Sequence, residues 1–325
     1  MNGTTRPAVW WMGVLAMLVC IGATNSASTP ARHIHDPVIT KDGSWYYLFS
    51  TGPGIFIHRS KDLVHWQRVG KVFMHDVPSW ARKAVPGSRG VWAPSITRTK
   101  GMFRLYYAVS TFGSNHSVIG LMTTPTLNPR SSAYHWHDEG MVVESDRRED
   151  FNAIDPYPFT TPHGDTVLAF GSFWSGIKLL TLNPQTGLAE TGALMKSLAF
   201  RPGSTAIEAP CLYYHGGWYY LFLSFDYCCR GVRSTYNIRV GRARELQGPY
   251  VDAADKPLMV GGGTQLLATS GNFIGPGHCS VLQVRRKAYL VYHYYDGADH
   301  GIPTLQLRPL QFNASGWPTL GGAMN

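Results

Sequence analysis

The sequence lacks the marks of a helical, a disordered or a zinc-binding protein. It has no long stretch rich in alanine, glutamate, lysine and leucine, no long low-complexity tract and no paired zinc motif, and only 15% of its residues are charged. Disorder outside the chain ends and a zinc ribbon are therefore disfavoured. Glycine (35 residues), proline (21 residues) and aromatic residues (13%) are abundant instead, which favours an all-β chain with many turns. A length of 325 residues allows one large domain or two ordinary ones.

Cysteine is scarce as well. One of the five cysteines, Cys20, lies in an apolar N-terminal run, and the others are Cys211, Cys228, Cys229 and Cys279. An even number of cysteines in an exported protein is compatible with disulfides. However, Cys228 and Cys229 are neighbours, which strains a bond between them, and Cys211 lies within an apolar run. We therefore expect mostly buried or site-lining thiols.

The N-terminus carries one apolar run, at residues 8–23, after Arg6 and before the small and polar residues 24–29. About 16 apolar residues are few for a membrane span but suit the core of a signal peptide. We predict that residues 1–27 are a signal peptide cleaved near Ala27. A retained membrane anchor is the alternative. The signal peptide predicts secretion to the extracellular space or the periplasm, with no membrane segment in the mature form.

One phrase returns five times along the chain and indicates the fold. Each copy has a start signal, a short apolar run, a polar turn and an aromatic-rich run, and the starts are Asp36-Pro37, Ala93-Pro94, Asp155-Pro156, Ala209-Pro210 and Gly277-His278. From Pro37 to Pro94, Pro156, Pro210 and His278, the steps are 57, 62, 54 and 68 residues. Repeats of this size are typical of propellers, whose blades contain about four strands each.

The predicted fold class is therefore all-β, a five-bladed β-propeller. Residues 28–325 would form a single propeller catalytic domain. An eight-strand sandwich would explain the strand pattern, but it does not predict five comparable starts.

In a propeller the inner strands run roughly parallel to the central axis, so equivalent strand starts meet at one end. The repeat thus predicts a ring made by Asp36, Trp92, Asp155, Glu208 and His278. Carboxylates that lie close together raise the pKa of at least one of them. A protonated acid beside an ionised one is what glycoside hydrolysis requires. The ring therefore predicts a sugar-cleaving enzyme.

Eight motifs occur in order between about His33 and Pro318: HDPVITKDGSWYYLFSTGPGI, GVWAPSI, LYYAVSTFG, NAIDPYPF, FGSFWSGIKL, IEAPCLYY, CCRG and GPGHCS. Together they resemble the endo-α-1,5-L-arabinanases of glycoside hydrolase family 43. The resemblance implies a five-bladed propeller that hydrolyses the arabinan backbone with inversion of configuration. Two positions depart from the family pattern: Cys279 stands where a small polar residue is expected, and Asp226-Tyr227 replaces a Trp-Gly-like pair.

The resemblance also implies residue roles. Asp36 matches the general base that activates water, Glu208 the general acid, and Asp155 the carboxylate that tunes the acid and orients the substrate. His278 matches a histidine beside a central calcium, which would be structural or electrostatic and bound mainly through water because calcium prefers oxygen ligands. The matched substrate-binding residues are His35, Trp92, Phe112, Asn152, Ser172, Trp174, Cys228 and Arg230.

The formal net charge is +9, and it becomes +8 when Arg6 leaves with the signal peptide. A basic enzyme is attracted to acidic polymers. The sequence has no dense lysine and arginine stripe and no nucleic-acid motif, so we predict no nucleic-acid partner. The predicted partners are plant cell-wall arabinan and pectin side chains, bound by a monomer. General solubility explains the charge equally well.

Three other functions stay open. An exo-acting α-L-arabinofuranosidase or β-xylosidase uses the same scaffold, often with an added β-sandwich domain for which this chain leaves little room. A non-catalytic sugar-binding propeller would not need three carboxylates. A fructan-cleaving propeller has three acidic residues but retains configuration and has a different surrounding sequence. We therefore expect endo-hydrolysis.

Overall fold

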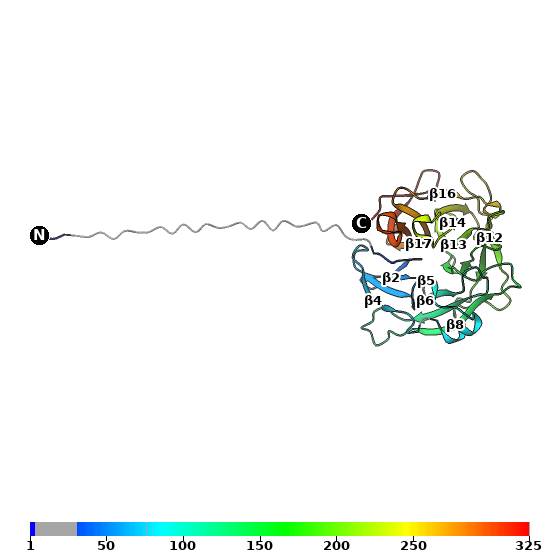
Figure 1. The fold of residues 1–325 in the computed structure, drawn as a ribbon, viewed down its shortest axis with the longest axis horizontal. Coiled ribbons are helices and arrows are strands. Elements are labelled where there is room, and N and C mark those ends of the chain that lie inside the picture. The colour runs from blue at the N-terminus through cyan, green and yellow to red at the C-terminus, as the bar shows by residue number, and fades with distance from the viewer. Residues whose placement is uncertain (4–30, 76, 325) are drawn as a thin grey trace.

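A computed structural model describes residues 1–3, 31–75 and 77–324. Most of the predicted signal peptide, residues 4–27, lies outside the described residues. Within them, twenty strands form five separate four-stranded antiparallel sheets. The sheets surround a common centre as the blades of a propeller, and the chain passes from one blade to the next in sequence order (Figure 1). The predicted all-β, five-bladed β-propeller is confirmed.

Each blade is built from four consecutive strands. The first has β1 (Val38–Asp42), β2 (Trp45–Ser50), β3 (Phe56–Ser60) and β4 (Gln67–Lys71), and the second has β5 (Trp92–Thr99), β6 (Met102–Val109), β7 (Ser117–Thr124) and β8 (His137–Ser145). The third has β9 (Tyr157–Thr160), β10 (Thr166–Phe170), β11 (Ile177–Thr181) and β12 (Lys196–Ala199). The fourth has β13 (Ile207–His215), β14 (Trp218–Phe225), β15 (Asn237–Ala243) and β16 (Thr264–Leu267). The fifth has β17 (Phe273–Val284), β18 (Lys287–Asp296), β19 (Ile302–Phe312) and β20 (Pro318–Leu320).

The described helices are short and connect strands. They are α1 (Ser79–Ala84) and the 3-10 turns η1 (Gly231–Arg233), η2 (Leu258–Val260) and η3 (Gly297–Asp299). No helix in the described ranges is long and apolar enough to cross a membrane.

The repeated phrase forms the inner hairpin of each blade. In the first blade the turn between β1 and β2 contains Gly43 at φ 57°, and in the second blade the turn between β5 and β6 contains Gly101 at φ 82°. Glycine adopts this left-handed backbone without the steric cost of a Cβ atom. The first strands of neighbouring blades contact one another, so they form the innermost layer and their starting residues meet.

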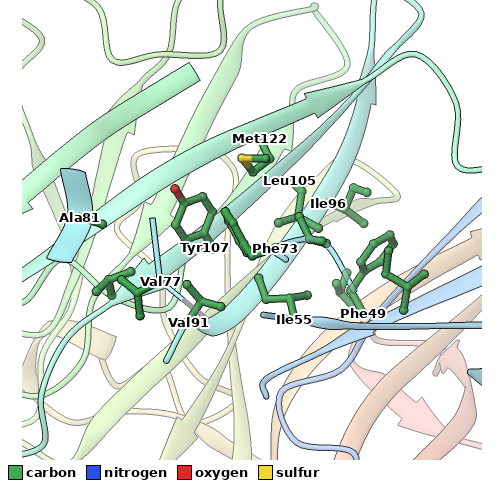
Figure 2. Packing of buried hydrophobic residues seen from close by; sticks show 14 of the residues in the cluster. Phe49, Ile55, Phe73, Val77, Ala81, Val91, Ile96, Leu105, Tyr107 and Met122 are labelled. Atoms are coloured by element: carbon green, nitrogen blue, oxygen red, sulfur yellow. The ribbon is translucent and has the colours of Figure 1, made fainter. Parts of the chain in front are cut away.

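Five hydrophobic clusters hold the blades together, one at each boundary between neighbours. The cluster between the first two blades packs Phe49 and Ile55 against Leu105 and Tyr107 (Figure 2). On the same strand β6, Tyr106 points the other way and belongs to the cluster with the third blade. Successive side chains of a strand face opposite sides of its sheet. Because both faces are covered, the second strands consist mostly of apolar and aromatic residues.

The cluster between the last and first blades closes the ring. It joins Ile34 and Leu48 to Val291 and Leu305. Backbone hydrogen bonds support the contact, because Ile34 donates to the carbonyl of Pro303 (2.9 Å) and Leu305 donates to that of Ala31 (2.9 Å). The segment that precedes the first strand is therefore part of the fifth blade's edge.

Candidate active site

One residue at the start of each inner hairpin adopts a left-handed backbone in all five blades. The five residues and their φ angles are Asp36 (52°), Ala93 (47°), Asp155 (57°), Ala209 (53°) and His278 (50°). This conformation is uncommon for residues other than glycine, and functional sites are where it often persists.

The residues of the predicted ring therefore come from two successive positions of the repeat: the left-handed residue and the residue before it. In three blades the left-handed residue itself carries the candidate group: Asp36, Asp155 and His278. In the other two blades that residue is an alanine, and the candidates Trp92 and Glu208 immediately precede it.

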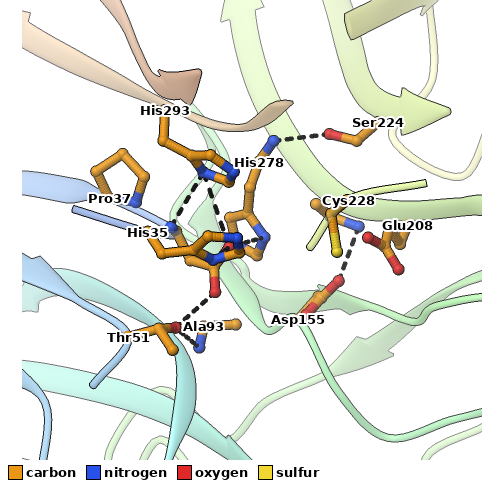
Figure 3. Close-up of polar contacts among 12 residues, drawn as sticks. His35, Pro37, Thr51, Ala93, Asp155, Glu208, Ser224, Cys228, His278 and His293 are labelled. Atoms are coloured by element: carbon orange, nitrogen blue, oxygen red, sulfur yellow. Dashed lines mark hydrogen bonds and ion pairs between the residues drawn. The ribbon is translucent and has the colours of Figure 1, made fainter. Parts of the chain in front are cut away.

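Hydrogen bonds between neighbouring blades hold several of these residues in place (Figure 3). In each case the backbone N–H of the left-handed residue donates to a side chain at the end of the previous blade's second strand. The bonds run from Ala93 to Thr51 Oγ1 (2.8 Å), from His278 to Ser224 Oγ (2.8 Å), and from Asp36 to His293 Nδ1 (3.2 Å).

Asp36 lies among three imidazoles. Its Oδ1 is 2.7 Å from His35 Nδ1, 3.1 Å from His278 Nδ1 and 3.9 Å from His293 Nδ1. Its Oδ2 accepts a 2.5 Å hydrogen bond from the hydroxyl of Thr51. Burial raises the pKa of Asp36, but the charges of His278 and His35 outweigh burial and hold the pKa well below its usual range. Asp36 is therefore ionised at neutral pH.

Glu208 is also buried, but it lacks this surrounding of imidazoles. Its Oε2 accepts a hydrogen bond from Ser172 Oγ (2.7 Å), and its Oε1 accepts one from Tyr236 Oη (2.6 Å). Burial raises the pKa of Glu208 above its ordinary value, and the charge of Asp36 adds to the effect, although the two hydrogen bonds oppose it. Glu208 thus holds a proton more readily than an exposed glutamate does.

Asp155 completes the set of carboxylates. Its Oδ2 accepts a hydrogen bond from the backbone N–H of Ala209 (3.1 Å), the residue after Glu208. Burial, followed by the charges of Glu208 and Asp36, raises the pKa of Asp155 well above its usual range. Two neighbouring carboxyls that repel each other titrate as a pair, and the pair retains one proton to higher pH than either would alone. The site therefore combines an ionised carboxylate with a pair that shares a proton.

A chain of hydrogen bonds links Asp36 to a loop of the fourth blade. The backbone N–H of Cys229 donates to Tyr295 Oη (2.7 Å), and Tyr295 Oη lies 2.9 Å from His35 Nε2. The ionised carboxylate of Asp36 can only accept from His35 Nδ1, so the unprotonated Nε2 of a neutral His35 accepts the O–H of Tyr295. In the neutral form of His35 the proton is then on Nδ1, which faces Asp36. Tyr295 therefore orients the imidazole beside the ionised carboxylate.

A family model for glycosyl hydrolases family 43 matches residues 30–318, nearly the whole described chain. The chain belongs to this family. As a family 43 member it is a glycoside hydrolase, and the predicted resemblance is confirmed.

Proteins similar to this chain include an exo-acting enzyme and an endo-acting enzyme. The chain is 41% identical to the extracellular exo-α-(1→5)-L-arabinofuranosidase ArbA of Cellvibrio japonicus, over 95% of this chain and 91% of that protein. It is 40% identical to the extracellular endo-α-(1→5)-L-arabinanase 1 of Bacillus subtilis, over 88% of this chain and 87% of that one. Among solved structures, the Cellvibrio cellulosa α-L-arabinanase complexed with arabinohexaose superimposes with a TM-score of 0.87 at 40% identity, covering 90% of this chain and 96% of that chain.

The other predicted substrate-binding residues of this family 43 enzyme lie in different surroundings. Trp92 and Phe112 form an aromatic pair with ring centroids 5.1 Å apart, and Phe112 is 81% exposed. The guanidinium of Arg230 lies 4.2 Å from the centroid of the Tyr227 ring. Trp174 is half-buried. Asn152 is buried, and its Oδ1 accepts a 2.7 Å hydrogen bond from Ser117.

The expectation for two of the cysteines was wrong. Cys228 and Cys229 are bonded to each other in a disulfide, whereas Cys211 and Cys279 are buried thiols as expected. The expectation rested on the strain of a bond between adjacent cysteines. Cys229 has a left-handed backbone, with φ 58°, which turns both sulfurs to the same side. The Cys229 sulfur lies 3.8 Å from His35 Nε2, so the disulfide borders the imidazole beside Asp36.

The donor set around His278 does not form a calcium site by itself. Calcium takes about six to eight oxygen ligands, yet no close group of three potential histidine, cysteine or carboxylate ligands in the described ranges includes His278. Water would have to supply most of the ligands. Calcium therefore stays a prediction.

Sequence reasoning missed five side chains that hold the predicted ones in place: Thr51, Ser224, Tyr236, His293 and Tyr295. Three of them occupy the same place in the repeat, at the end of the second strand: Thr51, Ser224 and His293. A hydroxyl or imidazole that interrupts the aromatic-rich run was the available signal. No comparable pattern marks Tyr236 or Tyr295.

Proposed function

We propose that this protein is a secreted, monomeric arabinanase that hydrolyses α-1,5-L-arabinofuranosidic bonds within arabinan, with inversion of configuration. Its natural substrates would be plant cell-wall arabinan and the arabinan side chains of pectin. The names of the similar enzymes support this substrate and an extracellular location. The observation that carries the proposal is the different surroundings of two buried carboxyls. Three imidazoles lie around Asp36 and lower its pKa, whereas Glu208 is bonded to the hydroxyls of Ser172 and Tyr236 and its burial raises its pKa.

These two shifts give the carboxyls different tasks in a direct displacement. Asp36, ionised, accepts a proton from water as the water oxygen attacks the anomeric carbon. Glu208, protonated, donates its proton to the oxygen of the leaving sugar as the glycosidic bond breaks. Asp155 helps to keep the proton on the Asp155–Glu208 pair, because each negative charge disfavours the other. The attacked carbon is inverted since water enters opposite to the leaving group.

The substrate would lie against the aromatic and polar groups around this ring. Trp92 and Phe112 offer an exposed aromatic wall to a sugar face. On another side, the guanidinium of Arg230 lies over the Tyr227 ring, and the disulfide of Cys228 and Cys229 borders His35 (Figure 3 labels Cys228 and His35). His35, Asn152, Ser172 and Trp174 complete the proposed substrate-binding set.

Calcium beside His278 is the proposed metal, with water as its main ligand. When bound, it would supply positive charge and rigidity at the centre of the ring. Addition of a chelator followed by calcium should lower and then restore the melting temperature. An unchanged melting temperature throughout would contradict the metal assignment.

Product analysis on linear α-1,5-arabinan over time tests the mode of cleavage. Endo-hydrolysis predicts long oligomers early in the reaction, with shorter products later. The second candidate is exo-hydrolysis, which the 41% identity to an exo-acting enzyme favours. It predicts release of a single short product from the start.

Glu208→Ala tests the assignment of Glu208 as the general acid. Loss of the acid should abolish cleavage of linear arabinan while the melting temperature stays close to that of the parent. Near-normal turnover by this variant would show that Glu208 is not the acid.

A further inference from the structure

A second groove lies far from the carboxylates, between the third and fourth blades. It has a volume of about 1090 Å³. Pockets for small ligands are typically about 300–1,000 Å³, so this groove has room for more than one sugar unit. Its lining comes from the β9–β10 and β13–β14 hairpins, from the outer strand β12, from the segment after β15 and from Met259 of η2.

The groove is at the opposite end of the propeller from the active site. Strand β13 connects the two places, because Glu208 is near its start and the groove residue Tyr214 is near its end. These residues are six positions apart in sequence. At about 3.3 Å per residue the strand separates them by roughly 20 Å. None of the groove's lining residues belongs to the proposed catalytic or substrate-binding set.

The charges of the groove are balanced. Lys196 and Arg244 are matched by Asp165 and Glu245, and all four side chains are exposed. A site for an acidic polymer needs an excess of positive charge. Balanced, planar polar groups suit a neutral ligand with many hydroxyls, because carboxylates accept and cations donate hydrogen bonds. The exposed amide of Gln247 adds both a donor and an acceptor.

The groove also contains an aromatic surface on a rigid support. The rings of Tyr214 and Tyr219 have centroids 4.9 Å apart, and Tyr214 is 37% exposed. The guanidinium of Arg244 is fixed beside them, because it donates to the carbonyl of Gly217 (3.2 Å) and lies 3.6 Å from the centroid of the Trp218 ring. Groups that are already ordered lose less entropy when a ligand binds.

We propose that this groove is a second polysaccharide-binding site, which takes a neutral stretch of arabinan chain. This inference rests on the proposed function for the identity of the sugar. Tyr214 contacts a sugar face, and the charged and amide side chains bind hydroxyls. Two sites on one molecule raise the effective concentration of polymer at the active site. A short oligosaccharide occupies one site at a time and gains nothing from the second.

Two variants test the groove: Tyr214→Ala and Gln247→Ala. Retention on a debranched-arabinan affinity gel is measured in a Glu208→Ala background, so that the polymer is not digested. We expect Tyr214→Ala to weaken binding about three- to tenfold, the size of one lost aromatic contact, and Gln247→Ala to weaken it less. In the active background, KM should rise on linear arabinan while kcat/KM on arabinotriose stays unchanged.

The matched controls are Tyr214→Phe, which keeps the ring, and Met141→Ala. Met141 lies on the outer strand β8 with a similar exposed fraction of 38%. Both controls should bind arabinan as the parent does. The proposal is overturned if Tyr214→Ala leaves retention unchanged, if it lowers arabinotriose turnover as much as arabinan turnover, or if it weakens retention on polygalacturonate as much as retention on arabinan.

These measurements distinguish a failure of the groove proposal from a failure of the proposed function. If the parent cleaves arabinan and Tyr214→Ala does not change its binding, only the proposal for the groove is contradicted. If the parent does not cleave arabinan but Tyr214→Ala weakens its binding, the groove proposal is supported and the proposed reaction is contradicted.

Discussion

Asp36 and Glu208 are both buried carboxylates, yet their surroundings shift their pKa values in opposite directions. The imidazoles of His278 and His35 lower one value, whereas burial and the charge of Asp36 raise the other. The difference comes entirely from neighbours that the fold supplies. It is the property on which the proposed division between base and acid depends.

This difference predicts an acidic pH range for activity. Asp36 must be ionised, so activity should fall in acid only as pH drops through its strongly lowered pKa. Glu208 must be protonated, so activity should fall as pH rises through its raised pKa. A profile of kcat/KM against pH on linear arabinan measures both limits. A basic limb that stays in place in Glu208→Gln, measured on its residual activity, would contradict the assignment.

Tyr295→Phe tests whether the position of His35 matters to the base. The variant keeps the ring but removes the hydroxyl that lies 2.9 Å from His35 Nε2. His35 loses the partner that orients it, so its hold on Asp36 weakens and the pKa of Asp36 should rise. We expect kcat to fall about tenfold, with the acidic limb of the pH profile displaced upward. An equal loss at every pH, or a lowered melting temperature alone, would mean that Tyr295 is only structural.

At the scale of the elements, the end of each second strand matters for the next blade. Thr51 accepts from the N–H of Ala93 and donates to Asp36, so one hydroxyl joins β2, the start of β5 and the base. Ser224 likewise accepts a hydrogen bond from the N–H of His278 across the boundary between the fourth and fifth blades. These bonds satisfy backbone groups that the left-handed turns leave without a strand partner.

Thr51→Val should therefore affect both stability and activity. Valine has nearly the same shape but leaves the buried N–H of Ala93 without an acceptor. We expect the free energy of unfolding to fall by about 1–3 kcal/mol, and turnover to fall with it because Asp36 loses a hydrogen bond. Urea unfolding and arabinan hydrolysis measure the two effects. Thr51→Ser keeps the hydroxyl and should restore both; a serine variant as impaired as the valine one would exclude the hydrogen bond as the cause.

The hairpins also show how far the repeated phrase reaches as a predictor. The five inner hairpins follow from local spacing, and the structure has them where the repeat predicts them. The ring residues start these hairpins, although Trp92 and Glu208 lie one position before the left-handed residue of their blades. The disulfide of Cys228 and Cys229 did not follow, because it depends on the left-handed backbone of Cys229. Local spacing does not reveal that backbone angle.

On the scale of the whole molecule, the ring is closed between the fifth and first blades by hydrophobic packing and by the backbone hydrogen bonds of residues 31–34 to β19. Ile34 is 1% exposed and lies between the first and fifth blades. The cluster that contains it is matched by four others around the ring, so each blade is held on both sides. Contacts at the boundary between the fifth and first blades also position the site, because His293 Nδ1 of the fifth blade accepts a hydrogen bond from the N–H of Asp36.

Ile34→Ala should weaken this closure. Removing a fully buried isoleucine side chain costs about 2–5 kcal/mol, and the melting temperature should fall accordingly. The matched control is Leu194→Ala, because Leu194 is 90% exposed and should have an effect of less than about 0.5 kcal/mol. Equal melting temperatures for the two variants would show that the Ile34 contact does not stabilise the ring.

The sequence by itself determined the number of blades, the inner hairpin of each and the three carboxylates, since all of these are written in local patterns that repeat along the chain. Only the tertiary structure decided which carboxylate is ionised. That depends on His278, His293 and Tyr236, which lie far from Asp36 and Glu208 in the chain and reach them only when the ring is closed. Electrostatic effects act through space over a few ångströms, so no reading of sequence spacing contains them.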